Sequence, residues 1–179
     1  MRRATLLFVI VVAGCSTSGS GASSPGHATP SAAAGSVNAV MHDQAGHDLG
    51  TLSVTESSQG FIVSGSLAHL PAGTHGIHLH TVGSCEGSFA SAGAHWNPTS
   101  RQHGFENPMG PHLGDLQNIV VGADSLAQVS VTNRGGVLRG AGGLLDADGA
   151  SIVVHAGPDD YRTDPSGNSG ARFACGVLH

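Results

Sequence analysis

The sequence predicts an all-β domain, an eight-stranded antiparallel Greek-key β-sandwich or barrel with two long functional loops. Short runs of Val, Ile and Leu with a weak two-residue alternation recur along the chain, which is typical of strands. The 28 glycines and the aromatic content of only 4% favour many turns between short elements. No stretch shows a sustained helical period. With 179 residues, the chain suits one domain that can close a real core.

Eight strands are expected, in the order of the chain. They are residues 36–41, 48–56, 60–70, 73–82, 126–133, 136–140, 150–156 and 171–178. Two long segments, 81–112 and 156–170, hold no strand pattern. Long segments without secondary structure in a compact domain are usually functional, and both contain the polar residues considered below.

The chain begins with a candidate targeting segment. Arg2 and Arg3 precede an apolar run, residues 4–14, that is too short to span a bilayer. The run ends in VAGC, which resembles a bacterial lipobox with Cys15 as the lipidated first residue of the mature chain. We therefore expect a lipoprotein signal peptide at 1–14 and an exported protein, lipid-anchored to the membrane at the bacterial cell envelope. An ordinary signal peptide followed by a chance cysteine is the alternative.

A tether and one domain are expected after the signal peptide. Residues 15–36 comprise the lipidated cysteine and a stretch with no Asp, Glu, Lys or Arg and no large apolar side chain. Such a stretch cannot bury enough surface to order itself, so we expect a flexible tether. The folded domain is expected over residues 37–179.

The cysteine count bears on the compartment. The chain has three cysteines, which leaves one unpaired in an exported protein. If Cys15 carries a lipid, Cys85 and Cys175 remain as a pair, and an exported compartment permits their disulfide.

The charge of the chain argues against one class of partner. The formal net charge is −5, and the chain has no lysine. Because phosphate contacts need Lys or Arg, no nucleic-acid partner is expected.

Histidines carry the first functional signal, with 12 in the chain. In the predicted strand GIHLH, His78 and His80 share one face while Ile77 and Leu79 share the other and belong to the core. Two imidazoles placed in this way can bind one metal ion. Two incidental histidines on a surface strand are the alternative.

Further candidate ligands follow along the chain. His95, His103, His112 and Asp115 supply three imidazoles and one carboxylate, a tetrahedral set suited to zinc. His155 lies at the end of a predicted strand, and imidazole also suits copper.

Five motifs together resemble those of the copper/zinc superoxide dismutases: GIHLH, SAGAHWNP, HLGDL, VVHAGPDD and NSGARFACGVL. The resemblance spans roughly residues 37–178 in the family's order, with Trp96 where the family more often has Phe or Tyr. It implies a disulfide between Cys85 and Cys175 and two metals bridged by His95. The implied copper ligands are His78, His80, His95 and His155, and the implied zinc ligands are His95, His103, His112 and Asp115.

The resemblance implies an enzyme that dismutates superoxide to oxygen and hydrogen peroxide by a copper redox cycle with a structural zinc. Arg172 would dock the substrate anion beside copper, and His95 would give a proton to the product. After residues 1–14, only five arginines face twelve acidic residues. Any further positive guidance of superoxide would have to come from the metals, Arg101 or Arg162.

The resemblance also implies a carboxylate behind the metal ligands. Asp164 is expected to link the copper ligand His78 to the zinc ligand His103, and such partners orient ligands. The alternative is a turn residue before a proline. Asp159 and Asp160 are expected to form a solvated acidic corner.

The remaining histidines receive structural or incidental roles. His75 is expected to form hydrogen bonds beneath the site. His42 and His47 are expected to be solvated, with a loosely held extra metal as the alternative, and His69 and His179 are expected to be solvated as well.

Two other functions compete with the dismutase. A catalytically silent domain of the same fold would bind or buffer copper without turnover, whereas a zinc hydrolase would need an open zinc position. The four-ligand zinc set argues against the hydrolase, and the complete ligand set with Arg172 favours the enzyme over the silent domain. A monomer and a homodimer are both compatible with the sequence.

Overall fold

A computed structural model of the chain describes residues 35–179. The expected signal peptide, Cys15 and almost all of the tether lie outside the described residues. No helix within 35–179 has the length and apolar character needed to cross a membrane.

The described residues form nine strands and one short 3-10 helix, so the all-β prediction is confirmed. The strands are β1 (Ser36–Asp43), β2 (Asp48–Ser57), β3 (Gly60–Ala68), β4 (Gly73–His75), β5 (Ile77–His80), β6 (Ile119–Val121), β7 (Leu126–Arg134), β8 (Ser151–His155) and β9 (Arg172–Val177), and the helix is η1 (Ala90–Ala92).

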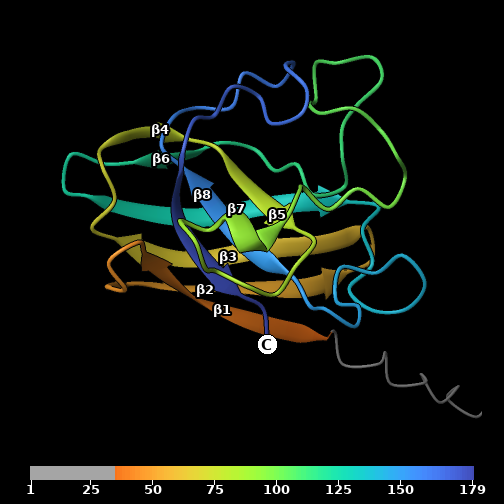
Figure 1. Ribbon diagram of the computed structural model, residues 1–179, viewed down its shortest axis with the longest axis horizontal. Helices are drawn as coiled ribbons and strands as arrows, with labels where there is room; N and C mark the ends of the chain where they lie inside the picture. Colours follow the sequence, from red (N-terminus) through yellow and green to blue (C-terminus); the bar gives the residue numbers. More distant parts are fainter. Residues whose placement is uncertain (1–34) are drawn as a thin grey trace, which may run out of the picture. The chain divides into compact units, whose positions relative to one another are not determined.

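Seven strands form one curled antiparallel sheet in the order β5-β8-β9-β1-β2-β3-β7, and β4 pairs with β6 in a second, two-stranded sheet (Figure 1). Several neighbours are far apart in sequence, such as β3 with β7 and β1 with β9. Crossovers of this kind are typical of Greek-key connections. They bring β5, β8 and β9, which carry the central motifs, side by side.

The core follows from residue alternation on these strands. Every second side chain of β7 is buried, from Ala127 to Asn133, and β1 repeats the pattern from Val37 to Met41. In β5, Ile77 and Leu79 are fully buried in the core, as expected. The opposite face of β5 is the one that the long loops cover.

The strand expected at residues 136–140 is wrong. The apolar side chains of this segment and the next are used in a turn, where Leu138 and Leu144 are buried and Leu144 N–H donates to Val137 O at 2.9 Å. Gly135 and Gly140, at the two ends of the segment, have φ of 82° and 98°, which is incompatible with an extended strand. The segment is instead a loop that buries Leu138 in the core and leaves Val137 exposed.

Two other elements differ from the expected pattern. The segment predicted at 73–82 divides at Gly76 into β4 and β5, which belong to different sheets. β6 was not expected, because three residues are too few for alternation to be recognised. Its pairing with β4 fixes the chain directly after the motif HLGDL.

Backbone hydrogen bonds hold two loop segments against β5. Leu79 N–H donates to Gly114 O at 2.9 Å, and Trp96 N–H donates to Leu79 O at 2.8 Å. A Cβ at Gly114 would lie 2.4 Å from Leu79 O, so this approach requires glycine. The arrangement places His95 and Asp115 beside the histidines of β5.

The disulfide between Cys85 and Cys175 is present, with the two Cα atoms 5.8 Å apart. It ties the loop after β5 to β9. Phe89 is buried against this bond in a small apolar cluster with Ala92 and Val153. The predicted pairing is therefore confirmed, and it fixes the loop that leads to His95.

Candidate metal centre

The histidines of β5 and β8 meet the loop histidine His95 in a buried group. Each of the four side chains has one ligand atom that lies within 4.8 Å of the others. The rings are in close contact, with centroids 4.0 Å apart for His78 and His95 and 4.8 Å apart for His78 and His155. The group consists of the predicted copper ligands His78, His80, His95 and His155.

One ring nitrogen on each of these four histidines is buried and has no hydrogen-bond partner. These atoms are His78 Nδ1, His80 Nε2, His95 Nε2 and His155 Nε2. Buried polar atoms without partners are costly and rare in proteins. Four such nitrogens in one place fit a cation that prefers imidazole ligands, which includes copper.

The other nitrogen of three of these rings is held by an acceptor. His80 Nδ1 donates to Gly93 O at 3.0 Å, and His155 Nδ1 donates to Gly170 O at 3.2 Å. His78 Nε2 donates to a carboxylate described below. These contacts fix the ring orientations and leave the partnerless nitrogens free to bind a metal.

A second group forms around the buried carboxylate of Asp115. Its Oδ1 atom accepts from the Nδ1 atoms of His95, His103 and His112, at 2.9, 3.0 and 3.2 Å. Its Oδ2 atom accepts from the backbone N–H groups of Gly104 and His112. Three imidazole nitrogens and one carboxylate are a donor set that fits zinc.

A closely spaced set of ligand atoms around Asp115 includes His78 in place of His112. Ligand atoms of His78, His95, His103 and Asp115 all lie within 4.8 Å of one another. His78 Nε2 already donates to a carboxylate, however, whereas His112 Nδ1 faces Asp115. The hydrogen bonds therefore favour His112 as the fourth ligand of this half.

His95 belongs to both groups. Its Nδ1 atom donates to Asp115 in the second group, and its partnerless Nε2 atom lies in the first. His78 also lies near both groups, but its Nε2 atom is already held by Asp159.

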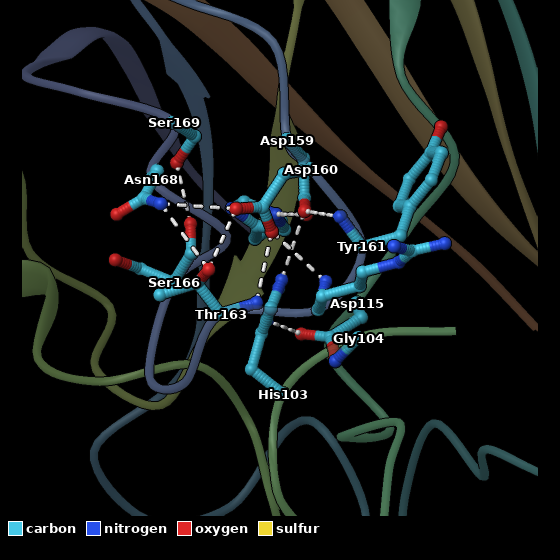
Figure 2. A network of polar contacts seen from close by, with 12 residues as sticks. His103, Gly104, Asp115, Asp159, Asp160, Tyr161, Thr163, Ser166, Asn168 and Ser169 are labelled. Carbon is cyan, nitrogen blue, oxygen red and sulfur yellow. Dashed lines mark hydrogen bonds and ion pairs between the residues drawn. The ribbon is translucent and has the colours of Figure 1, made fainter. Parts of the chain in front are cut away.

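The carboxylate behind the two groups is Asp159, and the expectation for Asp164 is wrong. Asp159 Oδ2 accepts from His78 Nε2 at 2.7 Å. Asp159 Oδ1 accepts from His103 Nε2 at 3.0 Å (Figure 2). Asp159 is only 4% exposed, so it is not part of a solvated corner. It lies four residues after His155, closer in the chain to the buried histidines than Asp164.

Asn118 fixes the backbone of Asp159 on both sides. Asn118 Nδ2 donates to Asp159 O, and Asp159 N–H donates to Asn118 Oδ1, both at 2.9 Å. The backbone N–H of Asn118 donates to Tyr161 Oη at 2.8 Å. Sequence reasoning missed Asn118, and its place three residues after Asp115 was the only available signal.

Asp160 is exposed, as expected, but it organises its loop. Its carboxylate accepts from the backbone N–H of Arg162. It also accepts from the backbone N–H and side chain of Thr163 and from the side chain of Asn168 (Figure 2). Backbone and side-chain hydrogen bonds from Thr163 lower the pKa of Asp160 to about 2. Asp160 therefore stabilises the conformation of the loop that carries Asp159.

Arg172 lies beside the first group. It pairs with His155 across β8 and β9, and its guanidinium donates to Phe89 O and to Gly93 O, the carbonyl that also accepts from His80. Partial burial lowers its pKa, but an arginine remains charged.

The two other arginines considered as guides are held elsewhere. Arg162 forms an ion pair with Glu106, and the guanidinium of Arg101 donates to Gly110 O. Within residues 35–179, Arg172 is thus the arginine that the structure brings to the first group, whose members we call the copper-type histidines (His78, His80, His95 and His155).

Burial dominates the protonation of the first group. It lowers the pKa of His78 to about 3 and that of His155 to about 4, and it lowers the pKa values of His80 and His95 as well. These rings are neutral near pH 7, the form that binds metals.

His103 differs from the first group. Burial alone would lower its pKa, but hydrogen bonds with the carboxylates of Asp115 and Asp159 outweigh burial and raise it to about 9. A metal at His103 therefore has to displace a proton.

The remaining histidines lie apart from both groups. His75 is buried, and its ring nitrogens contact His155 O and Pro71 O at 2.8 Å each, which agrees with the expected structural role. His47 is exposed and contacts Asp43 at 2.9 Å, and His69 and His179 are exposed. His42 is half-buried rather than solvated, and its Nδ1 atom is buried without a partner.

Comparison with known proteins gives consistent matches. Residues 48–178 match the family described as copper/zinc superoxide dismutase (SODC). A superoxide dismutase [Cu-Zn] of Caulobacter vibrioides is 45% identical over 148 residues, which cover 80% of this chain and 85% of that protein. Superoxide dismutase [Cu-Zn] 1 of Aquifex aeolicus is 36% identical over 145 residues, covering 79% of this chain and 86% of that protein.

Solved structures show the same fold. The crystal structure of a SOD-like protein from Bacillus subtilis superposes with a TM-score of 0.75 at 37% identity, covering 79% of this chain and 97% of that one. The Cu/Zn superoxide dismutase from Brucella abortus superposes with a TM-score of 0.65 at 29% identity, covering 81% of this chain and all of that one.

The shifted histidine pKa values predict how the metal-free protein responds to acid. The pKa values of His78, His80, His95 and His155 lie below 6.5 in the folded state, so the unfolded chain binds more protons below pH 6.5. The free energy of unfolding should fall by at least about 2 kcal/mol as the pH falls from 6.5 to 5. Urea unfolding at a series of pH values measures this loss.

His103 acts in the opposite direction. Its raised pKa contributes stability that is present below pH 6.5 and is lost as the pH rises toward 9. Four histidines have lowered pKa values and only His103 has a raised one, so the free energy of unfolding should still fall on acidification. An unfolding free energy that stays constant or increases between pH 6.5 and 5 would contradict these protonation states.

Proposed function

Because the chain belongs to the copper/zinc superoxide dismutase family, we propose that it dismutates superoxide. Two superoxide anions and two protons would give one oxygen and one hydrogen peroxide. Bound copper would supply the one-electron oxidation and reduction of superoxide, whereas bound zinc has no redox chemistry and would hold the ligands in place.

The observation that carries this proposal is the shared position of His95. Its two nitrogens face two different donor sets, one of partnerless imidazole nitrogens and one centred on a carboxylate. A hydrolytic zinc site would need three protein ligands and an open position. The second group already offers four ligand side chains, which disfavours hydrolysis.

Arg172 would bind the substrate. Its guanidinium is anchored by the carbonyls of Phe89 and Gly93 next to the copper-type histidines. An arginine fixed in this way can hold a small anion in one orientation through charge and hydrogen bonding. The disulfide supports the position, because Cys175 lies on the same strand and Cys85 lies in the loop that supplies both carbonyls.

His95 would supply a proton. Its Nε2 atom is buried and free of protein partners, and its Nδ1 atom is held by Asp115. This nitrogen could carry a proton only in the state in which it is not bound to copper, and that proton would then pass to the peroxide product. Burial, which lowers the pKa of His95, favours release of that proton.

The experiment is a superoxide dismutation assay with metal analysis of the same purified sample. We expect copper and zinc in equal amounts and a rate that is proportional to copper content. Full metal content without dismutation would instead support a silent copper-binding domain. Zinc-dependent hydrolysis without copper would support the hydrolase.

We predict that Arg172→Glu keeps both metals and lowers kcat/KM for superoxide by at least about tenfold. The change removes no ligand, but it places a negative charge where the substrate anion must bind. Arg139→Glu makes the same change of charge at an exposed loop arginine and should leave the rate nearly unchanged. His155→Ala should instead lose copper and keep zinc. An Arg172→Glu protein with full copper and an unchanged rate would remove Arg172 from the mechanism.

We also propose that the chain is exported and lipid-anchored through Cys15. The support is the apolar run that ends in VAGC, followed by the uncharged stretch 16–36. Cys15→Ser should move the protein from the membrane fraction to the soluble fraction, as measured by immunoblotting of fractionated cells. Cys85→Ser, which changes a different cysteine, should leave the distribution unchanged. An equal amount of Cys15→Ser protein in the membrane fraction would contradict the anchor.

A further inference from the structure

Asp164 lies on the same loop as Asp159. It contacts the other side of the second group, which we call the zinc-type group (His95, His103, His112 and Asp115). Its Oδ1 atom accepts from the backbone N–H of His103 at 2.6 Å and lies 3.8 Å from His112 Nε2. The second separation is within the distance of an ion pair for a protonated imidazole and is longer than a hydrogen bond. Asp164 therefore touches two adjacent ligands of this group and none of the four copper-type histidines.

The two outer histidines of the zinc-type group have matching surroundings. His103 lies between Asp115 at Nδ1 and Asp159 at Nε2, at 3.0 Å in both cases. His112 lies between Asp115 at Nδ1, at 3.2 Å, and Asp164 at Nε2. Each ring thus has one nitrogen toward the shared carboxylate and the other toward a second carboxylate from the loop 156–171.

We infer that Asp164 is a positioning residue for zinc, acting through His112. This inference rests on the proposed function, because it requires that His103, His112 and Asp115 hold zinc. A carboxylate behind a metal-bound imidazole fixes the ring and makes it a stronger ligand. Asp159 is hydrogen-bonded to His103 in this way, whereas Asp164 faces His112 Nε2 at 3.8 Å and would act on the ring through its charge.

The two contacts of Asp164 can be separated by substitution. The side chain of Asp164 is 49% exposed, so its loss leaves no cavity. Asparagine keeps the shape and an oxygen that can accept from the His103 N–H, but it removes the negative charge that faces His112. Asp164→Asn therefore tests the charge, whereas a role only in loop structure would be preserved by it.

The experiment measures metal affinity on the full-length chain. Zinc binding is followed by competition with a chelator of known affinity, and copper binding is measured in the same way. The absorption spectrum of Co²⁺ in place of zinc reports the ligand environment directly. We expect Asp164→Asn to bind zinc about tenfold more weakly, to shift the Co²⁺ bands and to bind copper as the unchanged protein does.

Two further variants serve as controls. Glu86→Gln removes an equal charge at an exposed position and should leave zinc affinity unchanged. Asp164→Glu keeps the charge on a longer arm and should restore zinc affinity to within about threefold of the original.

Three results would overturn the inference. They are an unchanged zinc affinity in Asp164→Asn, an equal loss of zinc and copper, and a failure of Asp164→Glu to restore zinc binding. If the unchanged chain itself bound no zinc, the proposed function would fail together with the inference, and this result is distinct from the other three.

Discussion

The carboxylate of Asp115 is the contact on which the metal centre depends. Burial alone would raise its pKa, but hydrogen bonds from the imidazoles of His103, His112 and His95 hold that pKa far below its usual range. Two backbone N–H groups, from Gly104 and His112, complete its shell. Five donors thus converge on one buried anion, and they come from both halves of the loop 93–115. A divalent cation could replace the imidazole protons and would then be bound by the same three imidazoles and the same carboxylate.

The fold divides the work between strands and loops. β5, β8 and β9 supply His78, His80, His155 and Arg172 from rigid paired backbone, so the copper-type nitrogens and the substrate arginine have fixed relative positions. The zinc-type ligands lie on a long loop that has little secondary structure of its own. That loop is held by Asp115, by the backbone hydrogen bonds of Gly114 and Trp96 with Leu79 of β5, and by the carboxylates of the loop 156–171. Preorganisation of the site therefore relies on buried charge as much as on the sheet.

The strand that carries His78 and His80 and the metal-ligand residues could be predicted from the sequence, because short local patterns identify them. The alternation of His78 with Ile77 and Leu79 places the histidines on one face of a strand, and the motifs around the ligands are specific. Contacts set by tertiary structure could not be read in this way. Asp159 and Asp164 are both acids in one loop, and the contacts that bury Asp159 come from Asn118, His78 and His103, which are far away in the sequence. Likewise, the apolar residues at 136–140 suggest a strand, yet glycines beside and within the segment have positive φ and it forms a loop that buries Leu138 and exposes Val137.

The central claim is that two different metals share the imidazole of His95. Anomalous diffraction at the copper and zinc absorption edges, from crystals of the metal-loaded protein, tests it most directly. We predict a copper peak among His78 Nδ1, His80 Nε2, His95 Nε2 and His155 Nε2, and a separate zinc peak among the Nδ1 atoms of His95, His103 and His112 and the carboxylate of Asp115. A single metal peak, or two peaks of which only one contacts His95, would contradict the account.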